Sequence, residues 1–597
     1  MESARELFQL TQEQQEIVEL PVDTCLLVQA GPGTGKTHTM TARIYHLVRE
    51  FDVAPGAEIL VLTFTRAAVR EIRRRCRNAG GRLSYVTAST FDSFASRLLR
   101  RFQPEALETW GTYDDRVKAA RRLIETDEEA RAFLAGYKHV FVDEIQDLVG
   151  VRSDFVKAIL ENSTGGFSLF GDPAQSIYNY QLEGEMRNIG SKELFDWLRQ
   201  RYPELVHRRL TKNHRARGTL ARWALRYGDL LGNHDVDFGS VYVEMVRAIN
   251  SYEPSIPISR LGMTVRTLAS KGKVAVLCRT NGECLQVSQL LWEQGVTHNV
   301  RRRAEDRYIP KWLALALREF EGVEIKSTGL KNRLRTAGVS DPDSVYDSLR
   351  RMTGGTKSGL RVPDLRERLA WGLLPDELEP VDQGAVVVST IHRAKGLEFD
   401  SVLFLWSPPG AELEFPGEEA RVLYVALTRP ISNLVRVRYD GFPGLMYDER
   451  FDRWIIKHFG WKLRRVEVNS SDVSTDEPPG PLAASEAERL EIQQYLSETV
   501  QAGDIVTLVN VDPKGVLPDL RFHICHDGRV IGMTNLEFSR LLRRLISGKW
   551  RPGRIHDVRI SGVRTVVGDP AHTKRLGLGS HGMWLVPEIS GLGNLGN

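Results

Sequence analysis

The stretch AGPGTGKT, residues 30–37, contains the first residue types whose spacing predicts chemistry. Its turn is made by three glycines, which let a backbone come close to a ligand: Gly31, Gly33 and Gly35. Lys36 and Thr37 follow, and the spacing matches G-x-x-x-x-G-K-[ST] with Ala30 at its first position. In such a loop, backbone N–H groups hold phosphate oxygens, the lysine reaches the β- and γ-phosphates and the threonine hydroxyl binds Mg²⁺. The pattern predicts a site for a nucleoside triphosphate with Mg²⁺.

Two carboxylates downstream complete the predicted site. Asp143 and Glu144 follow the apolar run 140–142, which we expect to be a buried strand. Ligands of open α/β sheets bind beyond the carboxyl ends of the strands. We predict that Asp143 holds Mg²⁺, directly or through water, and that Glu144 polarises an attacking water. An isolated Asp-Glu pair more often lies in a solvated loop, and the preceding strand favours the site instead.

The elements that position these residues are typical of an α/β fold. The apolar run 25–29 predicts a buried parallel strand that ends at the glycine-rich loop, and an amphipathic helix begins near Lys36. A strand followed by a basic helix is predicted at 60–75, and a second half with the same alternation begins at 273–296. We therefore expect parallel sheets covered by helices.

The composition limits the class of protein. A chain of 597 residues is too long for one core, and about 150 residues per domain predicts roughly four units. No apolar run reaches the roughly 18 residues that a membrane helix needs, and the N-terminus does not resemble a secretory signal. Five scattered cysteines favour a reducing, cytoplasmic compartment over a disulfide framework. We expect no membrane contact.

Arginine-rich clusters occur at 73–77, 97–101 and 208–217, although the net charge is only +4. Solvated helix faces and contacts to nucleic-acid phosphates explain such clusters equally well.

Further segments, taken in order, resemble a known family. They are LTQEQ (10–14), LVLTFTRAAVREIRRR (60–75), STFDSF (89–94), GDPAQSIY (171–178), NHRAR (213–217), HRAKGLEF (392–399) and YVALTRP (424–430). With the glycine-rich loop, they make residues 8–440 resemble superfamily 1 helicases of the UvrD/Rep type. The resemblance implies two RecA-like P-loop lobes that bind ATP and Mg²⁺. It also implies 3′ to 5′ movement on single-stranded DNA, or unwinding at a single-strand/duplex junction.

The resemblance also implies roles for individual residues. Gln14 would read the adenine edge, and Gln175 would sense the γ-phosphate. Arg215 and Arg429 would be arginine fingers, and Glu398 would accept a ribose hydroxyl. The other nucleotide contacts would come from Ala30, Gly31, Gly33, Thr34, Gly35, Lys36, Thr37, Thr39 and His214. The nucleic-acid path would be lined by Phe64, Thr65, Arg66, Thr90, Phe91, Tyr178, Tyr180 and His392.

The chain departs from the family pattern in three places. His214 stands where a tyrosine usually stacks on adenine, and imidazole is smaller and titrates near neutral pH. Asp92 replaces a histidine, and a carboxylate does not help to hold a phosphate. The two accessory insertions, predicted at about 100–135 and 322–380, are short. Because these insertions contact duplex in the family, we expect movement along a single strand more than strong unwinding by this chain alone.

The predicted domain boundaries follow from these assignments. Residues 1–218 would form lobe 1, 219–440 lobe 2, and 441–483 a connector whose polar, proline-rich end is a linker. Residues 484–597 predict a helix and then short β-strands, with a hairpin turn at Asp527-Gly528. We expect this β-rich accessory module to bind nucleic acid or a partner protein.

Two alternatives to a DNA motor stay open. One is a nucleotide-gated DNA sensor that acts with a partner nuclease or DNA repair factor, including in anti-phage defence. The other is an RNA-directed helicase, because backbone and stacking contacts tolerate both nucleic acids.

Overall fold

The chain falls into two units in the computed structural model, with boundaries that cross the sequence several times. The first unit comprises residues 1–255, 394–402 and 408–436, and the second comprises 256–393, 403–407 and 437–597. The structure describes residues 4–106, 113–178, 192–233, 236–301, 308–378, 384–405, 415–457, 463–514, 519–546 and 550–596.

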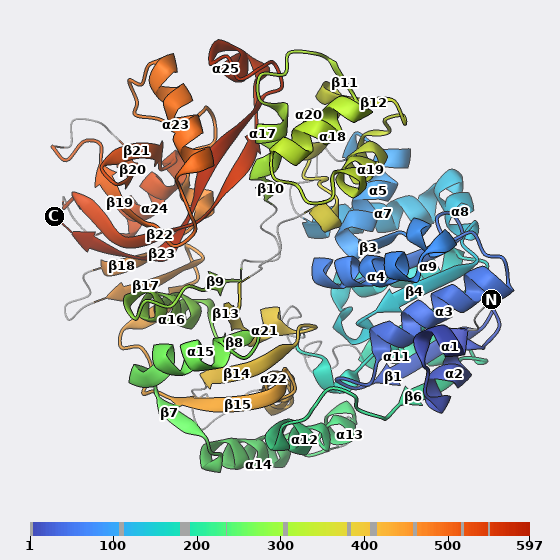
Figure 1. Ribbon diagram of the computed structural model, residues 1–597. Coiled ribbons are helices and arrows are strands. Elements are labelled where there is room, and N and C mark those ends of the chain that lie inside the picture. The colour runs from blue at the N-terminus through green and yellow to red at the C-terminus, as the bar shows by residue number, and fades with distance from the viewer. Residues whose placement is uncertain are drawn as a thin grey trace. The chain divides into compact units, whose positions relative to one another are not determined.

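A six-stranded sheet forms the centre of the first unit (Figure 1). Its strands, in spatial order, are β3 (Ala88–Thr90), β2 (Ile59–Thr63), β4 (His139–Asp143), β5 (Gly166–Gly171), β1 (Cys25–Ala30) and β6 (Val206–Leu210). Neighbouring strands pair in parallel. All residues of β2 and β4 are buried, as expected for parallel strands covered on both faces. The strands predicted at 25–29 and 140–142 are confirmed.

Helices precede, connect and follow these strands. They are α1 (Ala4–Phe8), α2 (Gln12–Val18), α3 (Lys36–Glu50), α4 (Arg66–Ala79), α5 (Phe91–Phe102), α7 (Tyr113–Thr126), α8 (Glu128–Ala135), α9 (Gly150–Asn162), α11 (Lys192–Arg201), α12 (Thr219–Leu225), α13 (Gly228–Gly232) and α14 (Phe238–Ser251). Thr65 and Thr90 start α4 and α5: each hydroxyl accepts a hydrogen bond from a backbone N–H three residues on, at 3.1 and 3.2 Å. The carboxyl ends of β2 and β3 therefore pass directly into helices.

A second six-stranded sheet carries the second half of the α/β pattern. Its order is β7 (Ser255–Pro257), β15 (Pro430–Arg438), β14 (Phe399–Leu405), β8 (Val274–Cys278), β13 (Val386–Thr390) and β9 (Asn299–Val300). Strand β13 pairs in parallel with β8 and β9. Its helices include α15 (Leu261–Ala269), α16 (Asn281–Glu293), α21 (Ile391–Ala394) and α22 (Pro416–Leu427). The prediction of an α/β fold with two parallel sheets is confirmed.

A third, antiparallel sheet corrects the predicted connector at 441–483. Its order is β16 (Leu445–Asp448), β17 (Arg453–Lys457), β18 (Leu463–Val468), β23 (Met583–Gly596), β22 (Arg554–Val567), β19 (Ile505–Asn510), β20 (Phe522–His526) and β21 (Arg529–Met533), with β10 (Ile309–Pro310) paired to β22. Three strands of this sheet come from the segment expected to be a connector. Ile455 of β17 and Val466 and Val468 of β18 are fully buried, while other residues of these strands are partly exposed, as is typical of a half-buried strand.

The proline-rich stretch after β18 is packed and does not form a free linker. Asp472 is buried and its carboxylate lies 2.7 Å from Arg453 Nη2. Arg489 donates a hydrogen bond to the Pro478 carbonyl. The predicted β-rich module is confirmed in its other parts. Its helices are α23 (Glu486–Glu498), α24 (Leu536–Leu545) and α25 (Pro570–Arg575), and its hairpin turns at Asp527 and Gly528, which have φ angles of 47° and 78°.

The helices of the predicted second insertion share one hydrophobic core with this sheet. The insertion contains α17 (Lys311–Leu317), α18 (Ser327–Thr336), α19 (Pro342–Thr353), α20 (Val362–Ala370) and the hairpin of β11 (Glu324–Lys326) with β12 (Gly359–Arg361). Leu365 of α20 and Leu508 of β19 belong to the same buried cluster. Thr565 of β22 accepts a hydrogen bond from Ala314 N at 3.2 Å and donates one to the Pro310 carbonyl at 2.7 Å. Insertion and β-module are therefore one structural body.

Burial of His298 predicts a pH-dependent stability. Its Nε2 lies 2.7 Å from Ser288 Oγ and its Nδ1 2.9 Å from the Val296 carbonyl, and burial lowers the pKa of His298 to about 4. An unfolded histidine titrates near pH 6.5, so between those values the unfolded chain binds more protons. The free energy of unfolding should fall by up to about 3 kcal/mol as pH decreases through this window.

Urea unfolding at pH 7.5 and pH 5 measures this effect. His298→Gln should flatten the pH dependence, whereas His556→Gln, at an exposed position, should not. An unchanged pH dependence in His298→Gln would contradict the assignment.

Candidate nucleotide and nucleic-acid site

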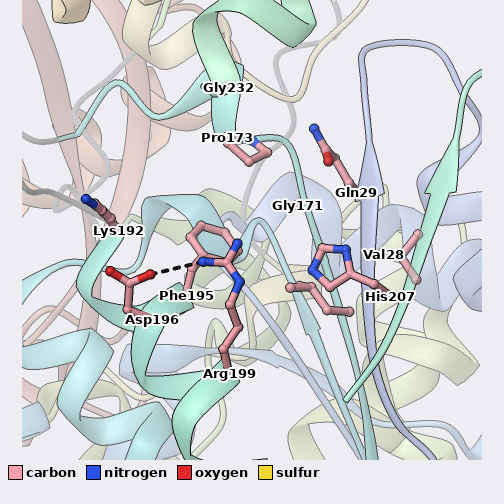
Figure 2. Close-up of a pocket in the computed structure, with 11 residues that line it drawn as sticks. Val28, Gln29, Gly171, Pro173, Lys192, Phe195, Asp196, Arg199, His207 and Gly232 are labelled. Carbon is pink, nitrogen blue, oxygen red and sulfur yellow. Dashed lines mark hydrogen bonds and ion pairs between the residues drawn. The ribbon is translucent and has the colours of Figure 1, made fainter. Parts of the chain in front are cut away.

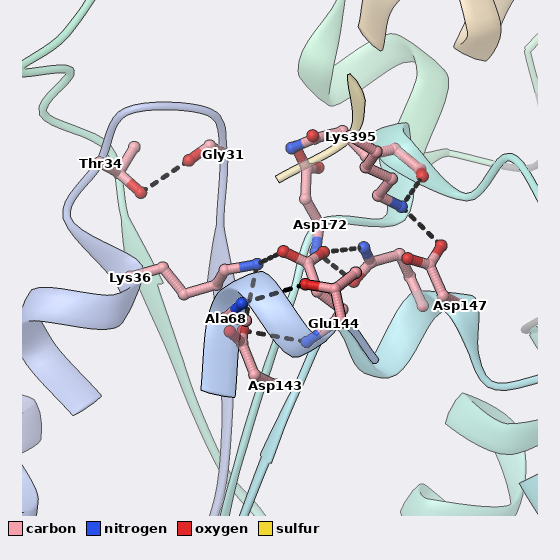
Figure 3. Close-up of polar contacts among 12 residues, drawn as sticks. Gly31, Thr34, Lys36, Ala68, Asp143, Glu144, Asp147, Asp172 and Lys395 are labelled. Carbon is pink, nitrogen blue, oxygen red and sulfur yellow. Dashed lines mark hydrogen bonds and ion pairs between the residues drawn. The ribbon is translucent and has the colours of Figure 1, made fainter. Parts of the chain in front are cut away.

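The glycine-rich loop joins β1 to α3 in a conformation that requires glycine (Figure 3). Gly33 and Gly35 have φ angles of 74° and 85°. A Cβ on Gly33 would lie 2.6 Å from Arg215 Cβ, and a Cβ on Gly35 would lie 2.6 Å from Gln14 Nε2. Thr34 closes the turn, with its hydroxyl donating to the Gly31 carbonyl at 2.8 Å. The loop ends at the N-terminus of a helix of 15 residues, where free N–H groups favour anionic oxygens.

Lys36 lies against both predicted carboxylates (Figure 3). Its Nζ is 3.2 Å from Asp143 Oδ1 and also donates to Glu144 Oε1. Burial disfavours the charged lysine, but the two carboxylates outweigh it and raise the pKa of Lys36. Burial also opposes ionisation of Glu144, but Lys36 and Lys395 outweigh it and lower the pKa of Glu144 to about 2. The site thus holds an ionised carboxylate beside a charged lysine at neutral pH.

The same edge of the sheet offers oxygen ligands for a divalent cation. Asp143 ends β4, burial raises its pKa, and Lys36 opposes this rise. Thr37 is half-buried in the first turn of α3. A carboxylate and a hydroxyl are hard oxygen donors, so these two residues fit Mg²⁺ held together with phosphate oxygens.

A chain of hydrogen bonds leads from Glu144 to Arg429. Gln146 Nε2 donates to Glu144 Oε2 at 2.5 Å, and Gln146 Oε1 accepts from Asp172 N at 2.9 Å. Asp172 Oδ2 accepts from Gln175 Nε2 at 2.6 Å, and Gln175 Oε1 accepts from Arg429 Nη2 at 2.9 Å. All five residues lie in the first unit and, apart from Glu144, are at most 6% exposed. Three predicted site residues are therefore linked through two that the sequence did not single out.

Arg215 shows that this site fits an anionic ligand. Its Nη2 pairs with Glu398, but its Nε and Nη1 are buried without a hydrogen-bond acceptor in the described chain. A buried N–H without a partner costs roughly 1–3 kcal/mol. Phosphate oxygens would supply acceptors that match the guanidinium fork. Because Glu398 already binds Arg215, its predicted contact to a ribose hydroxyl would have to coexist with this ion pair.

Gln14 lies beside the glycine-rich loop with part of its hydrogen-bonding capacity used. Its Oε1 accepts from Thr11 N at 3.0 Å and its Nε2 donates to the Thr34 carbonyl at 3.3 Å. A carboxamide has two N–H groups and two lone pairs, so one donor and one acceptor remain for an adenine edge. The backbone N–H of His214 donates to the Gly33 carbonyl at 2.8 Å, which places His214 beside the loop.

Lys395 connects this site to two aromatic residues of the predicted nucleic-acid path. Its Nζ is 2.5 Å from Asp147 Oδ1, donates to the Gln175 carbonyl and lies 5.7 Å from the ring centre of Tyr178. Burial raises the pKa of Asp147 to about 7, although Lys395 opposes this rise. Tyr178 in turn packs against Phe64, with 4.8 Å between ring centres.

The remaining path residues differ in their surroundings. Thr65 and Thr90 cap helices, and Arg66 is the first residue of α4. Phe91 is only 1% exposed, so it packs in the core and does not line the path as predicted. Tyr180 lies outside the described residues, and His392 lies in α21 of the second unit.

Asp92 and part of the arginine clusters have structural partners within the first unit. Asp92 pairs with Arg152 at 3.0 Å, so its carboxylate is neutralised within the lobe. The arginine clusters partly serve the fold: Arg74 and Arg75 bind Glu71, and Arg97 lies 4.8 Å above the Phe94 ring.

The functional residues that sequence reasoning missed are Gln146, Asp147, Asp172 and Lys395. Asp172 and Lys395 lie inside segments that resemble the family, and Gln146 and Asp147 follow Asp143 and Glu144 closely in the sequence, but only the contacts assign these four residues a place in the site.

A separate pocket of about 150 Å³ lies beside β1 and α11 (Figure 2). Gln29 and Pro173 line it, and Asp196 pairs with Arg199 at its edge at 3.0 Å. Ligand sites of drug-sized molecules usually span about 300–1,000 Å³, so this pocket is small for a nucleotide. The glycine-rich loop remains the candidate nucleotide site.

Comparisons with known proteins agree with this geometry. The model of the UvrD/REP helicase N-terminal domain matches residues 10–110 and 107–193, and that of the UvrD-like helicase C-terminal domain matches 356–438. The chain is 24% identical over 567 residues to the ATP-dependent DNA helicase UvrD2 of Mycobacterium tuberculosis, covering 70% of this chain and 77% of the relative. It is 43% identical over 77 residues to the ATP-dependent DNA helicase PcrA of Staphylococcus aureus, covering 13% and 10%.

Among solved structures, the Pif1 helicase from Candida albicans matches with a TM-score of 0.36 and 12% identity, over 72% of this chain and 95% of that one.

Within the described ranges, no helix has both the length and the apolar character required to cross a membrane.

Proposed function

The chain belongs to the UvrD/Rep family of superfamily 1 ATP-dependent DNA helicases, and we propose that it is a motor that moves 3′ to 5′ along single-stranded DNA. The observation that carries the motor proposal is the hydrogen-bond chain from Glu144 to Arg429, together with the contact of Lys395 to Gln175 and Tyr178. The polarity follows from the family resemblance. It joins the hydrolytic carboxylate to an aromatic pair that suits base stacking. A single-strand/duplex junction is the proposed substrate for unwinding.

Each residue of the site has a proposed part in hydrolysis. Lys36 and the loop N–H groups bind the β- and γ-phosphates, and Arg215 directs its unpaired N–H groups to the transferred phosphoryl group. Glu144, which is ionised, orients the attacking water and accepts its proton. Thr37 and Asp143 would hold Mg²⁺, which offsets phosphate charge when bound.

Coupling to movement would run through Gln175. Its carboxamide bridges Asp172 and Arg429, and its carbonyl accepts from Lys395 beneath Tyr178. A change in the partners of Gln175 during hydrolysis would therefore alter the support of Tyr178. A motor needs such a link between the hydrolytic site and the residues on which bases stack.

The proposed compartment and partner follow from fewer observations. All five cysteines are free, which supports a reducing, cytoplasmic location. A protein partner, such as a nuclease or DNA repair factor, would meet residues 484–597 as part of the larger body that includes the insertion helices.

The test is ATP hydrolysis with and without single-stranded DNA, followed by displacement of streptavidin from strands biotinylated at either end. The proposal expects strong stimulation by DNA and faster displacement from the 5′ end. Low hydrolysis that DNA does not raise would contradict an autonomous motor and favour the sensor. Stimulation by RNA alone would favour an RNA-directed helicase.

Tyr178→Ala should weaken binding of single-stranded DNA. Stacking of a base on an aromatic ring contributes about 1–3 kcal/mol, so the Kd should rise roughly 5- to 150-fold. Fluorescence anisotropy with a labelled oligonucleotide measures the change. Tyr85→Ala is the matched control, because Tyr85 is 71% exposed in the same unit and has no predicted part in binding. Equal affinities of the two variants for single-stranded DNA would contradict the assignment of Tyr178 to the nucleic-acid path.

A further inference from the structure

Arg43 of α3 is a fully buried cation that binds neutral oxygens. Its Nε donates to Ser168 Oγ at 2.9 Å, and its Nη1 and Nη2 donate to backbone carbonyls. Burial lowers the pKa of Arg43 to about 9, which still leaves it charged at neutral pH. A buried charge without a carboxylate partner is costly, so its hydrogen bonds must compensate.

The carbonyls that Arg43 binds belong to the end of α2 and the turn that follows it. Nη1 lies 3.0, 3.3 and 2.8 Å from the carbonyl oxygens of Ile17, Val18 and Leu20, and Nη2 lies 3.0 Å from that of Pro21. Helix α2 ends at Val18. The last carbonyls of a helix have no partner within the helix and carry its negative dipole end, which a cation stabilises.

His139 of β4 adds a second contact to the turn that follows α2. Its Nε2 lies 2.9 Å from Ser168 Oγ and its Nδ1 2.6 Å from the Val22 carbonyl. Arg43 of helix α3 and His139 of strand β4 therefore hold the segment 17–22 from two different elements. Because α2 has only seven residues, it depends on such tertiary contacts to form at all.

The opposite end of α2 presents Gln14 to the glycine-rich loop. Thr11 caps the helix, and its backbone N–H donates to Gln14 Oε1. Gln14 Nε2 reaches the Thr34 carbonyl, close to Gly35. Less than two helical turns thus separate the carbonyls bound by Arg43 from Gln14, the side chain predicted to read adenine.

We propose that Arg43 is a positioning residue for base recognition: its guanidinium fixes the C-terminal end of α2, and thereby the place of Gln14 at the phosphate loop. The inference rests on the proposed binding of ATP at this loop. Arginine is required there because its planar fork reaches carbonyls on two sides and Ser168 as well, whereas the single ammonium of lysine cannot.

The test compares Arg43→Lys, Gln14→Ala and the double variant in DNA-stimulated hydrolysis of ATP and GTP. Arg43→Lys should raise the KM for ATP about tenfold, with kcat changed less than about twofold, and lower the preference for ATP over GTP by a similar factor. Because Arg43 acts through Gln14, adding Arg43→Lys to Gln14→Ala should not lower the preference for ATP over GTP any further.

Arg421→Lys is the matched control. Arg421 is also buried in the first unit and donates to a carbonyl, that of Leu231, at 3.1 and 3.2 Å. The Arg421→Lys variant should lower the thermal midpoint without changing the preference for ATP over GTP. If Arg43→Lys does not fold, Ser168→Ala removes only the Nε acceptor and should shift base preference in the same direction by a smaller factor.

The inference would be overturned if Gln14→Ala lost the preference for ATP over GTP while folded Arg43→Lys or Ser168→Ala retained it. Arg43 would then have a purely structural role. A wild-type chain that hydrolyses ATP and GTP equally would also overturn it, while the motor proposal would stand. If the wild type hydrolyses neither, the motor proposal fails, and equilibrium binding of ATP and GTP to the same variants still decides the role of Arg43.

Discussion

Lys36→Ala should lower DNA-stimulated ATP hydrolysis by at least about 10²–10³-fold, the effect of removing one preorganised donor from a developing charge. Two losses combine in this variant. The phosphates lose a cation, and Asp143 and Glu144 lose the charge that now lies 3.2 Å from Asp143 and contacts Glu144. Without it, burial and repulsion between the two carboxylates should raise the pKa of Glu144 from about 2, and Glu144 also loses the cation that it contacts.

Steady-state hydrolysis and binding of labelled DNA measure these effects separately. Binding of single-stranded DNA in the absence of nucleotide should change less than about twofold, because Lys36 lies at the phosphate loop. Lys138→Ala is the matched control, since this lysine pairs with Glu58 at 2.8 Å and is 53% exposed. Hydrolysis in Lys36→Ala near the wild-type rate would show that the loop does not hold the hydrolysed nucleotide.

Removing residues 484–597 should unfold the insertion helices together with the β-rich module. A chain ending at residue 483 loses β19 to β23, which supply much of the core that also buries Leu330, Leu349 and Leu365. The apolar side chains left exposed would favour aggregation or local unfolding. Hydrogen exchange should show lost protection over 311–378, and the first unit should keep its own protected sheet.

Point substitutions test the shared core without truncation. Leu365→Ala and Leu508→Ala lie far apart in the sequence, yet each should destabilise the same unfolding transition by about 2–5 kcal/mol. Ile505→Ala is the matched control, because Ile505 lies in the same strand as Leu508 but is 60% exposed and should change stability by less than about 0.5 kcal/mol. Separate transitions for the two leucine variants would show two independent domains.

The sequence by itself determined the α/β class and singled out candidate residues for a nucleotide site. Spacing sufficed to select Lys36, Thr37 and Asp143 as candidates, because a phosphate loop and a carboxylate at a strand end are local patterns. The hairpin at Asp527-Gly528 was equally local, since its positive φ angles demand those residue types. Family resemblance extended these assignments to Gln175 and Arg429, which the structure brings into contact.

Tertiary structure decided what depends on contacts between distant segments. Lys395 and Asp147 are 248 positions apart, so no local pattern could pair them. The same reason explains why residues 441–483 were taken for a connector: β18 pairs with β23 at the end of the chain, and this pairing joins β16 and β17 to the sheet. Strand pairing is set by partners rather than by propensity. Phe91 and Arg43 were misjudged or overlooked because only burial distinguishes a core residue from a site residue of the same type.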